Sequence, residues 1–297
     1  MNYNKNWRKI VFLTFVLLFI EVRTLEHDGV DAVYVINLDR NPERLKEMKE
    51  QLGKFGIRFQ KLRASDGYNI KIVNKNTGKI EDNKQFHKNC DDGVYLIQDD
   101  GITVEYIRCV LRYREALCCG ELGCALSHIR IWLDIVRHGY KRAIIFEDDV
   151  CFENNFPQIL KETLKNVPSD VDILFLDVGV IHGECATPYF VSPGALLQSF
   201  ERLQSDNKYV VRLRDKSSNT FGAHAYMVTK AGAEKLIKNS KTLRWPIDNH
   251  IMWMNNISQY VARKKMLYVN GEKSEIHTMG RRISVISDKV VVGESKQ

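Results

Sequence analysis

Three consecutive acidic residues, Glu147, Asp148 and Asp149, are the part of the sequence best suited to chemistry. They directly follow Lys141–Phe146, whose apolar AIIF run predicts a buried strand. Ligands of open α/β sheets bind just outside the carboxyl ends of strands. Clustered carboxylates repel one another unless a cation neutralises them, and their hard oxygens suit Mg²⁺ or Mn²⁺. We therefore expect a metal site here, and the alternative is a solvated turn.

A second polar cluster follows the predicted strand Ala32–Leu38, at Asn37-Leu38-Asp39-Arg40. A helix is expected to start at Pro42, so Arg44 lies one turn into it. A helix N-terminus after a strand is suited to a nucleotide or phosphate. Asp66 follows the next predicted strand, Ile57–Leu62, and could approach the same ligand, although Asp-Gly also favours an ordinary turn. No glycine-rich fingerprint supports a dinucleotide site.

The remaining elements must position these residues. Strand, helix and strand over residues 32–62 form a βαβ unit, which requires a parallel pair. A helix over Glu121–Val136 carries a continuous apolar stripe. Further strands are predicted at Val171–Leu176, Tyr209–Leu213 and Ala223–Val228, and further helices at Phe156–Leu164, Ala231–Lys238 and Asp248–Met254. This alternation predicts a single α/β domain with a mostly parallel central sheet, interrupted by a polar insertion near 69–118 whose Asn69–Lys84 part is expected to be an exposed loop.

Charge argues against nucleic acid as a partner. The 297 residues carry a formal net charge of +7, and residues 1–24 hold +3 of it, which leaves +4 for the rest. That mild excess suits an anionic ligand such as a nucleotide diphosphate. No stripe of Lys and Arg interleaved with aromatic residues is present, so no nucleic-acid partner is expected.

The N-terminus predicts targeting to a membrane. Lys5, Arg8 and Lys9 precede the apolar run Ile10–Ile20, which has 11 residues. A bilayer span usually needs about 20. Residues 1–24 therefore indicate a signal peptide or signal anchor, with a buried helix as the third alternative. We expect residues 25–297 to be membrane-associated or in a secretory lumen, namely the ER or Golgi of a eukaryote or a bacterial envelope.

Cysteine spacing adds little to this. The seven cysteines include no C-x-x-C pair, which disfavours a structural zinc site, and their odd number leaves at least one unpaired within the monomer. One glycosylation sequon, Asn256-Ile257-Ser258, would matter only in a eukaryotic lumen.

Three segments resemble glycosyltransferase family 25, the group of lipopolysaccharide-biosynthesis and collagen galactosyltransferase-like proteins. They are VYVINLDRNPERL with RASDG (33–45 and 63–67), GELGCALSHIRIW with IIFEDDV (120–132 and 144–150), and FGAHAYMVTKAGAEKL with PID (221–236 and 246–248). The resemblance implies a GT-A-type (Rossmann-like) fold, a UDP-sugar donor, commonly UDP-galactose, Mn²⁺ dependence and inversion at the anomeric carbon. The long insertion and the proline-free Tyr268–Glu272 depart from the family pattern, which leaves the acceptor open: lipooligosaccharide, another glycan or a peptide-linked site.

On this interpretation, Glu147 and Asp149 face the metal, because alternate residues of an extended segment share a face. The remaining donor-binding candidates are Asp148 for the ribose or sugar, Asn37, Arg44 and Asp66 for the nucleoside, and Ser127 and His128 on the helix packed beneath the acidic turn. His128 could equally be a core residue.

An inverting transfer needs a base to deprotonate the acceptor hydroxyl. Asp248 is the candidate, with a helix N-cap as its alternative role, and Asp177 is the reserve. His224 and His277 are candidate late metal ligands.

Two other functions compete with a transferase. One is a non-catalytic, membrane-tethered binding protein on the same fold, in which the acidic triplet would be expected to degenerate. The other is phosphoryl transfer, for which the sequence offers no P-loop or equivalent phosphate clamp.

Overall fold

A computed structural model describes residues 28–83, 86, 93–108, 117–177, 179–180, 207–213 and 220–269. The predicted signal segment 1–24 and the candidate ligand His277 lie outside these ranges. Within them, no helix combines the length and apolar character needed to cross a bilayer.

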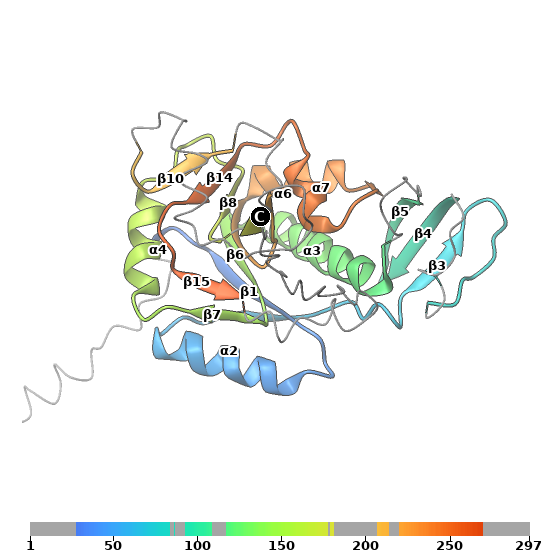
Figure 1. Ribbon diagram of the computed structural model, residues 1–297, viewed down its shortest axis with the longest axis horizontal. Coiled ribbons are helices and arrows are strands. Elements are labelled where there is room, and N and C mark those ends of the chain that lie inside the picture. Colours follow the sequence, from blue (N-terminus) through green and yellow to red (C-terminus); the bar gives the residue numbers. More distant parts are fainter. Residues whose placement is uncertain are drawn as a thin grey trace, which may run out of the picture.

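A seven-stranded sheet forms the centre of the described chain (Figure 1). Its strand order is β10-β14-β8-β12-β6-β1-β2. In chain order the strands are β1 (Ala32–Asn37), β2 (Gln60–Arg63), β6 (Arg142–Glu147), β8 (Ile173–Phe175), β10 (Val210–Arg212), β12 (Ala225–Thr229) and β14 (Gln259–Ala262). The predicted βαβ unit is confirmed, because β1 pairs in parallel with β2.

The expectation of a mostly parallel sheet is wrong. β1 is parallel to β2 and β6, and β8 is parallel to β14, but β12 runs antiparallel to both β6 and β8, and β10 runs antiparallel to β14. The sheet is therefore mixed. An apolar run predicts that a strand is buried, but it carries no signal for the direction in which that strand enters the sheet. The narrower GT-A assignment stays a prediction.

Helices pack on both faces of this sheet. The helices are α2 (Pro42–Lys54), α3 (Cys119–His138), α4 (Phe156–Lys165), α6 (Lys230–Asn239) and α7 (Ile247–Met252). One hydrophobic core joins the sheet to α3, α6 and α7, and a second joins its other face to α2 and α4. Alternate residues of β1 show the division: Tyr34 belongs to the first core, and Val33 and Val35 to the second. The architecture is a three-layer α/β sandwich.

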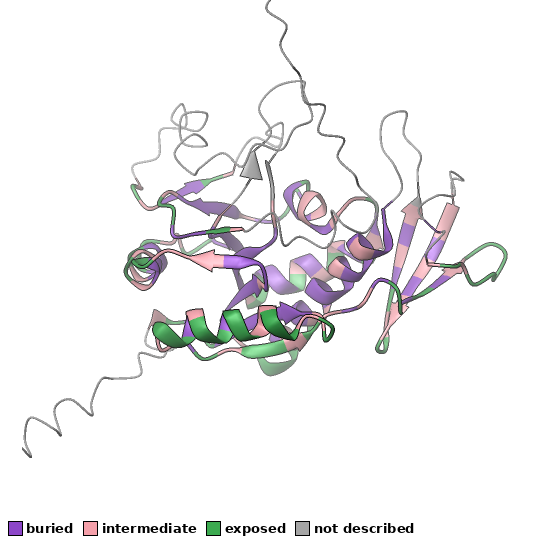
Figure 2. Cartoon of the chain, turned by 60° about the horizontal axis from the view of Figure 1, so that its bottom comes forward, coloured by how far each residue is buried: buried purple, intermediate pink, exposed green. Residues whose placement is uncertain are grey.

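The insertion is more ordered than the sequence predicts. Its described part forms β3 (Lys71–Asn74), β4 (Gly93–Asp99) and β5 (Ile102–Arg108), which join β13 (Thr242–Leu243) in a second sheet. This sheet lies to one side of the sandwich (Figure 2). The loop expected over Asn69–Lys84 therefore contains a strand. Asp100 and Gly101, both with positive φ, turn β4 into β5, and Asp-Gly is the pair that such a tight hairpin favours.

The described chain also contains two short antiparallel pairs of strands. They are β7 (Val150–Phe152) with β15 (Leu267–Val269), and β9 (Gly179–Val180) with β11 (Thr220–Phe221).

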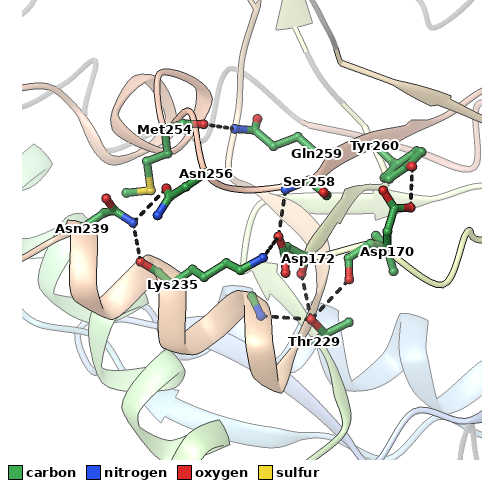
Figure 3. A network of polar contacts seen from close by, with 12 residues as sticks. Asp170, Asp172, Thr229, Lys235, Asn239, Met254, Asn256, Ser258, Gln259 and Tyr260 are labelled. Atoms are coloured by element: carbon green, nitrogen blue, oxygen red, sulfur yellow. Dashed lines mark hydrogen bonds and ion pairs between the residues drawn. The ribbon is translucent and has the colours of Figure 1, made fainter.

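A buried carboxylate, Asp172, holds α6 against the sheet where β8 begins and β12 ends (Figure 3). Asp172 accepts hydrogen bonds from Lys235 Nζ at 2.5 Å and from the backbone amide of Ser258 at 2.8 Å. Thr229 caps α6 by accepting from the amide of Gly232 at 3.0 Å. A Cβ on Gly232 would lie 2.2 Å from the Asp172 carbonyl oxygen, so only glycine permits this approach of helix and strand.

Candidate functional site

The candidate residues gather at one edge of the central sheet. Asn37 ends β1, Glu147 ends β6, and Asp177 lies two residues beyond β8. His224 directly precedes β12, and the antiparallel direction of β12 brings its beginning to the ends of its neighbours. The Glu147 amide donates to the His224 carbonyl at 2.8 Å, which fixes this alignment. Four segments distant in sequence thus meet where α/β sheets bind ligands.

A pocket opens above this edge, between the acidic turn, the start of α2, the loop after β2 and the first turns of α3. Its lining comprises Ile36, Leu38, Arg40, Arg44, Ala64, Ser65, Gly67, Gly120, Cys124, Ser127, Glu147, Asp148 and Asp149. The acidic triplet therefore shares a pocket with the first βαβ unit, and the solvated-turn alternative is wrong: Asp148 and Asp149 are each only 8% exposed.

Asp148 is held by two of the predicted donor-binding residues. Asn37 Nδ2 donates to Asp148 Oδ2 at 2.7 Å, and Arg44 Nη1 donates to Asp148 Oδ1 at 2.8 Å. Both carboxylate oxygens of Asp148 therefore receive donors from the β1–α2 unit. Arg44 and Asp148 line the pocket, and buried Asn37 supports Asp148 from behind it.

Asp149 differs from Asp148 in that one of its oxygens, Oδ1, is buried without a hydrogen-bond partner. The cation beside it is Arg44, whose Nη2 lies 3.8 Å from Asp149 Oδ2. Burial, together with the negative charge of Glu147, raises the pKa of Asp149 to about 7. A carboxyl group in this state is stabilised by a cation.

Glu147 is engaged from the helix side. His128 Nε2 lies 3.2 Å from Glu147 Oε1, and Cys124 Sγ lies 3.7 Å from the same oxygen. Burial acts to raise the pKa of Glu147, but the hydrogen bond with His128 and the charge of His224 outweigh it and hold the pKa below its usual value. Glu147 therefore keeps its negative charge, although the carboxyl group of Asp149 lies near it.

His224 lies among carboxylates. Its Nε2 is 3.4 Å from Asp177 Oδ2. Burial acts to lower the pKa of His224, but Asp177, Glu147 and Asp149 together raise it above the usual value. His224 and Asp177 are consequently part of the same charged cluster as the acidic turn.

Asp248, the candidate base, lies in the first turn of α7 rather than at its N-cap, which is Pro246. Its Oδ2 accepts from the Gly222 amide at 3.3 Å and its Oδ1 from the Asn249 amide at 2.7 Å. The capping alternative is therefore wrong. Burial first, then the charges of Glu147 and Asp248, raises the pKa of Cys124 in the pocket lining, so Asp248 acts electrostatically on this part of the site.

Ser127 and Asp66 shape the loop after β2. Ser127 Oγ accepts from the Ser65 amide at 2.9 Å and donates to the Gly123 carbonyl at 2.8 Å. A Cβ on Gly123 would lie 2.5 Å from the Ser65 carbonyl oxygen, so the loop rests directly on the α3 backbone. Asp66 forms an ion pair with Arg40, which lines the pocket.

The predicted metal ligands have the chemistry that a hard divalent cation prefers, although the compact cluster of potential ligands in the described chain is Cys124, His128 and Glu147. Glu147 and Asp149 offer carboxylate oxygens, and His224 offers one imidazole nitrogen. Besides Asp149 Oδ1, two further buried oxygens near the pocket, Asn37 Oδ1 and Ser65 Oγ, have no hydrogen-bond partner. Unpaired buried polar atoms are rare in folded proteins, and a bound ion can supply the partner that such atoms lack.

Cys124, Ser65 and Tyr226 belong to the site, although the sequence did not single them out. Cys124 and His128 are four residues apart in a predicted helix, and that spacing could have placed them on one face beneath Glu147. Tyr226 has the pattern of a plain core residue in a strand, so the contact of its hydroxyl with His128 Nδ1, at 2.8 Å, had no sequence signal.

The model of glycosyltransferase family 25 (LPS biosynthesis protein) matches residues 30–251. Curated relatives include the human inactive glycosyltransferase 25 family member 3, 27% identical over 75% of this chain and 31% of that protein. A Drosophila melanogaster glycosyltransferase 25 family member is 30% identical over 44% of this chain and 18% of its own length.

Another relative is procollagen galactosyltransferase 1 of Danio rerio, 25% identical over 79% of this chain and 33% of that protein. The chain thus spans about a third of the length of the human and zebrafish relatives. The family match extends from just before β1 into α7 and includes the acidic turn, the α2 start and the α3 helix. On that match, the chain belongs to glycosyltransferase family 25.

Proposed function

We propose that this protein is a metal-dependent glycosyltransferase that moves a hexose, with galactose the first to test, from a UDP-sugar to a hydroxyl of a glycan or glycosylated acceptor. The observation that carries the proposal is Asp149: a buried carboxyl with an unpartnered oxygen and a raised pKa, beside Glu147 and at the base of a pocket. Family membership supports the transfer of a sugar, and the zebrafish relative's name supports galactose.

The charges in the pocket suit a nucleotide diphosphate. Arg40, in the loop before α2, and Arg44, in the first turn of α2, line it together with Glu147 and Asp149. A diphosphate would be repelled by these acids alone, but a bound divalent cation reverses the sign of the local field. The arginines and the cation would then hold the same anionic group from two sides.

Glu147 and Asp149, with His224 as a further candidate, would hold the cation. When bound, Mn²⁺ or Mg²⁺ would neutralise the negative charge that develops on the departing nucleoside diphosphate. Asp148 has a different role: fixed by Asn37 and Arg44, it would orient the ribose or sugar of the donor.

Asp248 is the proposed base for an inverting displacement. Its electrostatic influence on Cys124 supports a place beside the pocket. Asp177 is the weaker candidate, because its carboxylate contacts His224. Proton transfer by a positioned carboxylate usually contributes about 10²–10⁴-fold to a rate. Asp248→Asn should therefore lower turnover by that order while leaving donor binding intact.

The test is release of UDP from a panel of UDP-sugars by residues 25–297, with Mn²⁺, with Mg²⁺ or with EDTA. Water is offered first, then glycan and peptide-linked acceptors. We expect release to require the metal and to be lost in Asp149→Asn. Asp170→Asn is the matched control, because Asp170 lies outside the pocket and contacts Tyr260 and Arg212. Metal-independent release, or normal release by Asp149→Asn, would overturn the metal assignment.

A non-catalytic binding protein is the second candidate, and the names of the human, rat, mouse and bovine relatives as inactive or probable inactive members favour it. In that case residues 1–24 would tether a domain that binds a nucleotide-sugar without turnover. Calorimetry decides between the two: metal-dependent UDP-sugar binding with no release in any acceptor screen supports the binding protein.

A further inference from the structure

Behind Glu147, three buried side chains form a hydrogen-bonded series that leads from the core to the acidic turn. Trp132 Nε1 lies 2.9 Å from the hydroxyl of Tyr226, and His128 Nδ1 lies 2.8 Å from the same hydroxyl. The other ring nitrogen, His128 Nε2, lies 3.2 Å from Glu147 Oε1. Trp132, Tyr226 and His128 are all 0% exposed, so water cannot substitute for any of these partners.

The number of hydrogens in this series determines its direction. An indole nitrogen can only donate, so Trp132 donates to Tyr226. The Tyr226 hydroxyl has a single hydrogen, and the acceptor beside it is Nδ1 of His128. Nδ1 therefore accepts, which places the ring proton of a neutral imidazole on Nε2. His128 then donates from Nε2 to Glu147 Oε1, and every polar group of the series is satisfied.

A metal ion bound by Cys124, His128 and Glu147 is the competing interpretation, because one ligand atom from each lies within 4.8 Å of the others. Coordination would require the lone pair of His128 Nε2 and would move the ring proton to Nδ1. Nδ1 and the indole would then both donate to the Tyr226 oxygen, and the Tyr226 hydrogen would be left buried without an acceptor. An unsatisfied buried donor is unfavourable, so the geometry favours the hydrogen-bonded arrangement.

We infer that His128 is a positioning residue that fixes the Glu147 carboxylate through an Nε2–H donor, in a tautomer set by Tyr226 and Trp132. The consequence of this arrangement for metal binding rests on the proposed function. The contacts of both His128 and Cys124 fall on Oε1, so Glu147 presents Oε2 to the cation as a single-oxygen ligand. Partners that orient ligating carboxylates are typically worth about 10–100-fold in metal affinity.

Two measurements on the whole chain test this. The ¹⁵N shifts of the His128 ring report the tautomer directly and need neither metal nor substrate. Mn²⁺ affinity, followed by EPR of the free ion, is compared across wild type, His128→Leu, His128→Gln and Tyr226→Phe. Gln keeps a donor near the position of Nε2, whereas Leu removes it. His138→Leu is the control, because His138 lies on the same helix and pairs with the Asp134 carboxylate on its exposed face.

We expect an Nε2–H ring, a fall of about 10–100-fold in Mn²⁺ affinity for His128→Leu, and substantial recovery in His128→Gln. Tyr226→Phe leaves the His128 imidazole in place but removes the hydroxyl that fixes its tautomer. Its Mn²⁺ affinity should therefore lie between those of wild type and His128→Leu. This variant also covers the case in which the leucine variant fails to fold.

The inference is overturned by an Nδ1–H ring, by unchanged Mn²⁺ affinity in a folded His128→Leu, or by Zn²⁺ binding that is lost in both Cys124→Ser and His128→Gln. If wild type binds no Mn²⁺, the proposed function fails. The tautomer of the His128 ring then still decides whether the hydrogen bonds from Trp132 to Glu147 have the direction described.

Discussion

The side-chain amide of Asn37 donates to Asp148 Oδ2 across 2.7 Å, from the last residue of β1 to the turn that follows β6. The two strands are parallel neighbours, with Ile36 paired to Glu147, so their ends lie side by side. This contact joins the two segments that the sequence marks for chemistry, 111 residues apart. The β1–α2 unit and the acidic turn are consequently one site.

Asn37→Asp tests this join, because it changes one donor to an acceptor with little change in size. A second carboxylate against Asp148 should repel it and lower the free energy of unfolding by about 1–3 kcal/mol. The loss should be larger at pH 8 than at pH 5, since two close carboxyl groups cannot both ionise easily. Urea unfolding at both pH values measures it. Asn76→Asp, in an exposed turn, is the control, and an equal effect there would contradict the join.

The raised pKa of Asp149 predicts that the folded protein loses stability as the pH rises. Its pKa of about 7 in the folded protein lies above the ordinary value of 3.8. Between these values the folded state keeps a proton that the unfolded state has released. Stability should therefore fall as pH rises through this window, and the full cost applies above pH 7.

Asp149→Asn removes that cost. In EDTA at pH 8 the variant should melt a few degrees above wild type, since about 1 kcal/mol corresponds to about 2–4 °C in domains of 150–250 residues. The gap should narrow towards pH 4. Mn²⁺ should then raise the melting temperature of wild type and leave the variant unchanged. A lower melting temperature for the variant at pH 8 would refute the raised pKa.

Gly123→Ala tests the contact between α3 and the loop after β2. The added methyl would lie 2.5 Å from the Ser65 carbonyl oxygen and 2.9 Å from the Gly67 nitrogen, both of them backbone atoms. The loop must move, at about 1–3 kcal/mol of stability, and UDP-sugar affinity should fall because Ser65 and Gly67 line the pocket.

Gly53→Ala, in the last turn of α2, is its matched control. No atom lies within 4 Å of the added methyl, so a small stabilisation of about 0.4–1 kcal/mol is expected. Thermal melts and calorimetric titration with UDP-sugar measure both variants. Equal behaviour of the two would show that the loop does not depend on the α3 backbone.

The contacts of Asp172 predict that its substitution lowers the stability of the fold without affecting the proposed metal site. Its side chain is 4% exposed and receives both Lys235 and the Ser258 amide, while Lys235 itself is 41% exposed. Asp172→Ala should cost about 1–3 kcal/mol, because the Ser258 amide loses its partner. Lys235→Met should cost less than Asp172→Ala, because Asp172 keeps the Ser258 amide as a donor and no backbone group loses its partner. Urea unfolding distinguishes them, and a larger loss for the lysine variant would reverse the assignment. Neither change should alter Mn²⁺ affinity.

The sequence by itself determined the local elements and the chemistry of the acidic turn. Apolar runs and helical stripes located β1, α2, α3, β6 and α6 to within a few residues, because burial imposes a period on side chains. An Asp-rich segment at the end of a buried strand likewise identified Asp148 and Asp149 without reference to the rest of the chain. The strands of the insertion were missed although they carry a signal: Tyr95 and Ile97 in β4, and Val104 and Tyr106 in β5, are buried at alternate positions on either side of the Asp100-Gly101 turn.

Only the tertiary structure decided which residues meet. Strand direction depends on the path of the connections, so the antiparallel β12 that brings His224 to Glu147 had no signature in the sequence. The same holds for Tyr226 behind His128 and for the pairing of Asn37 with Asp148. Each of these contacts joins segments far apart in the chain, and their geometry is set by packing of the whole sheet rather than by any local pattern.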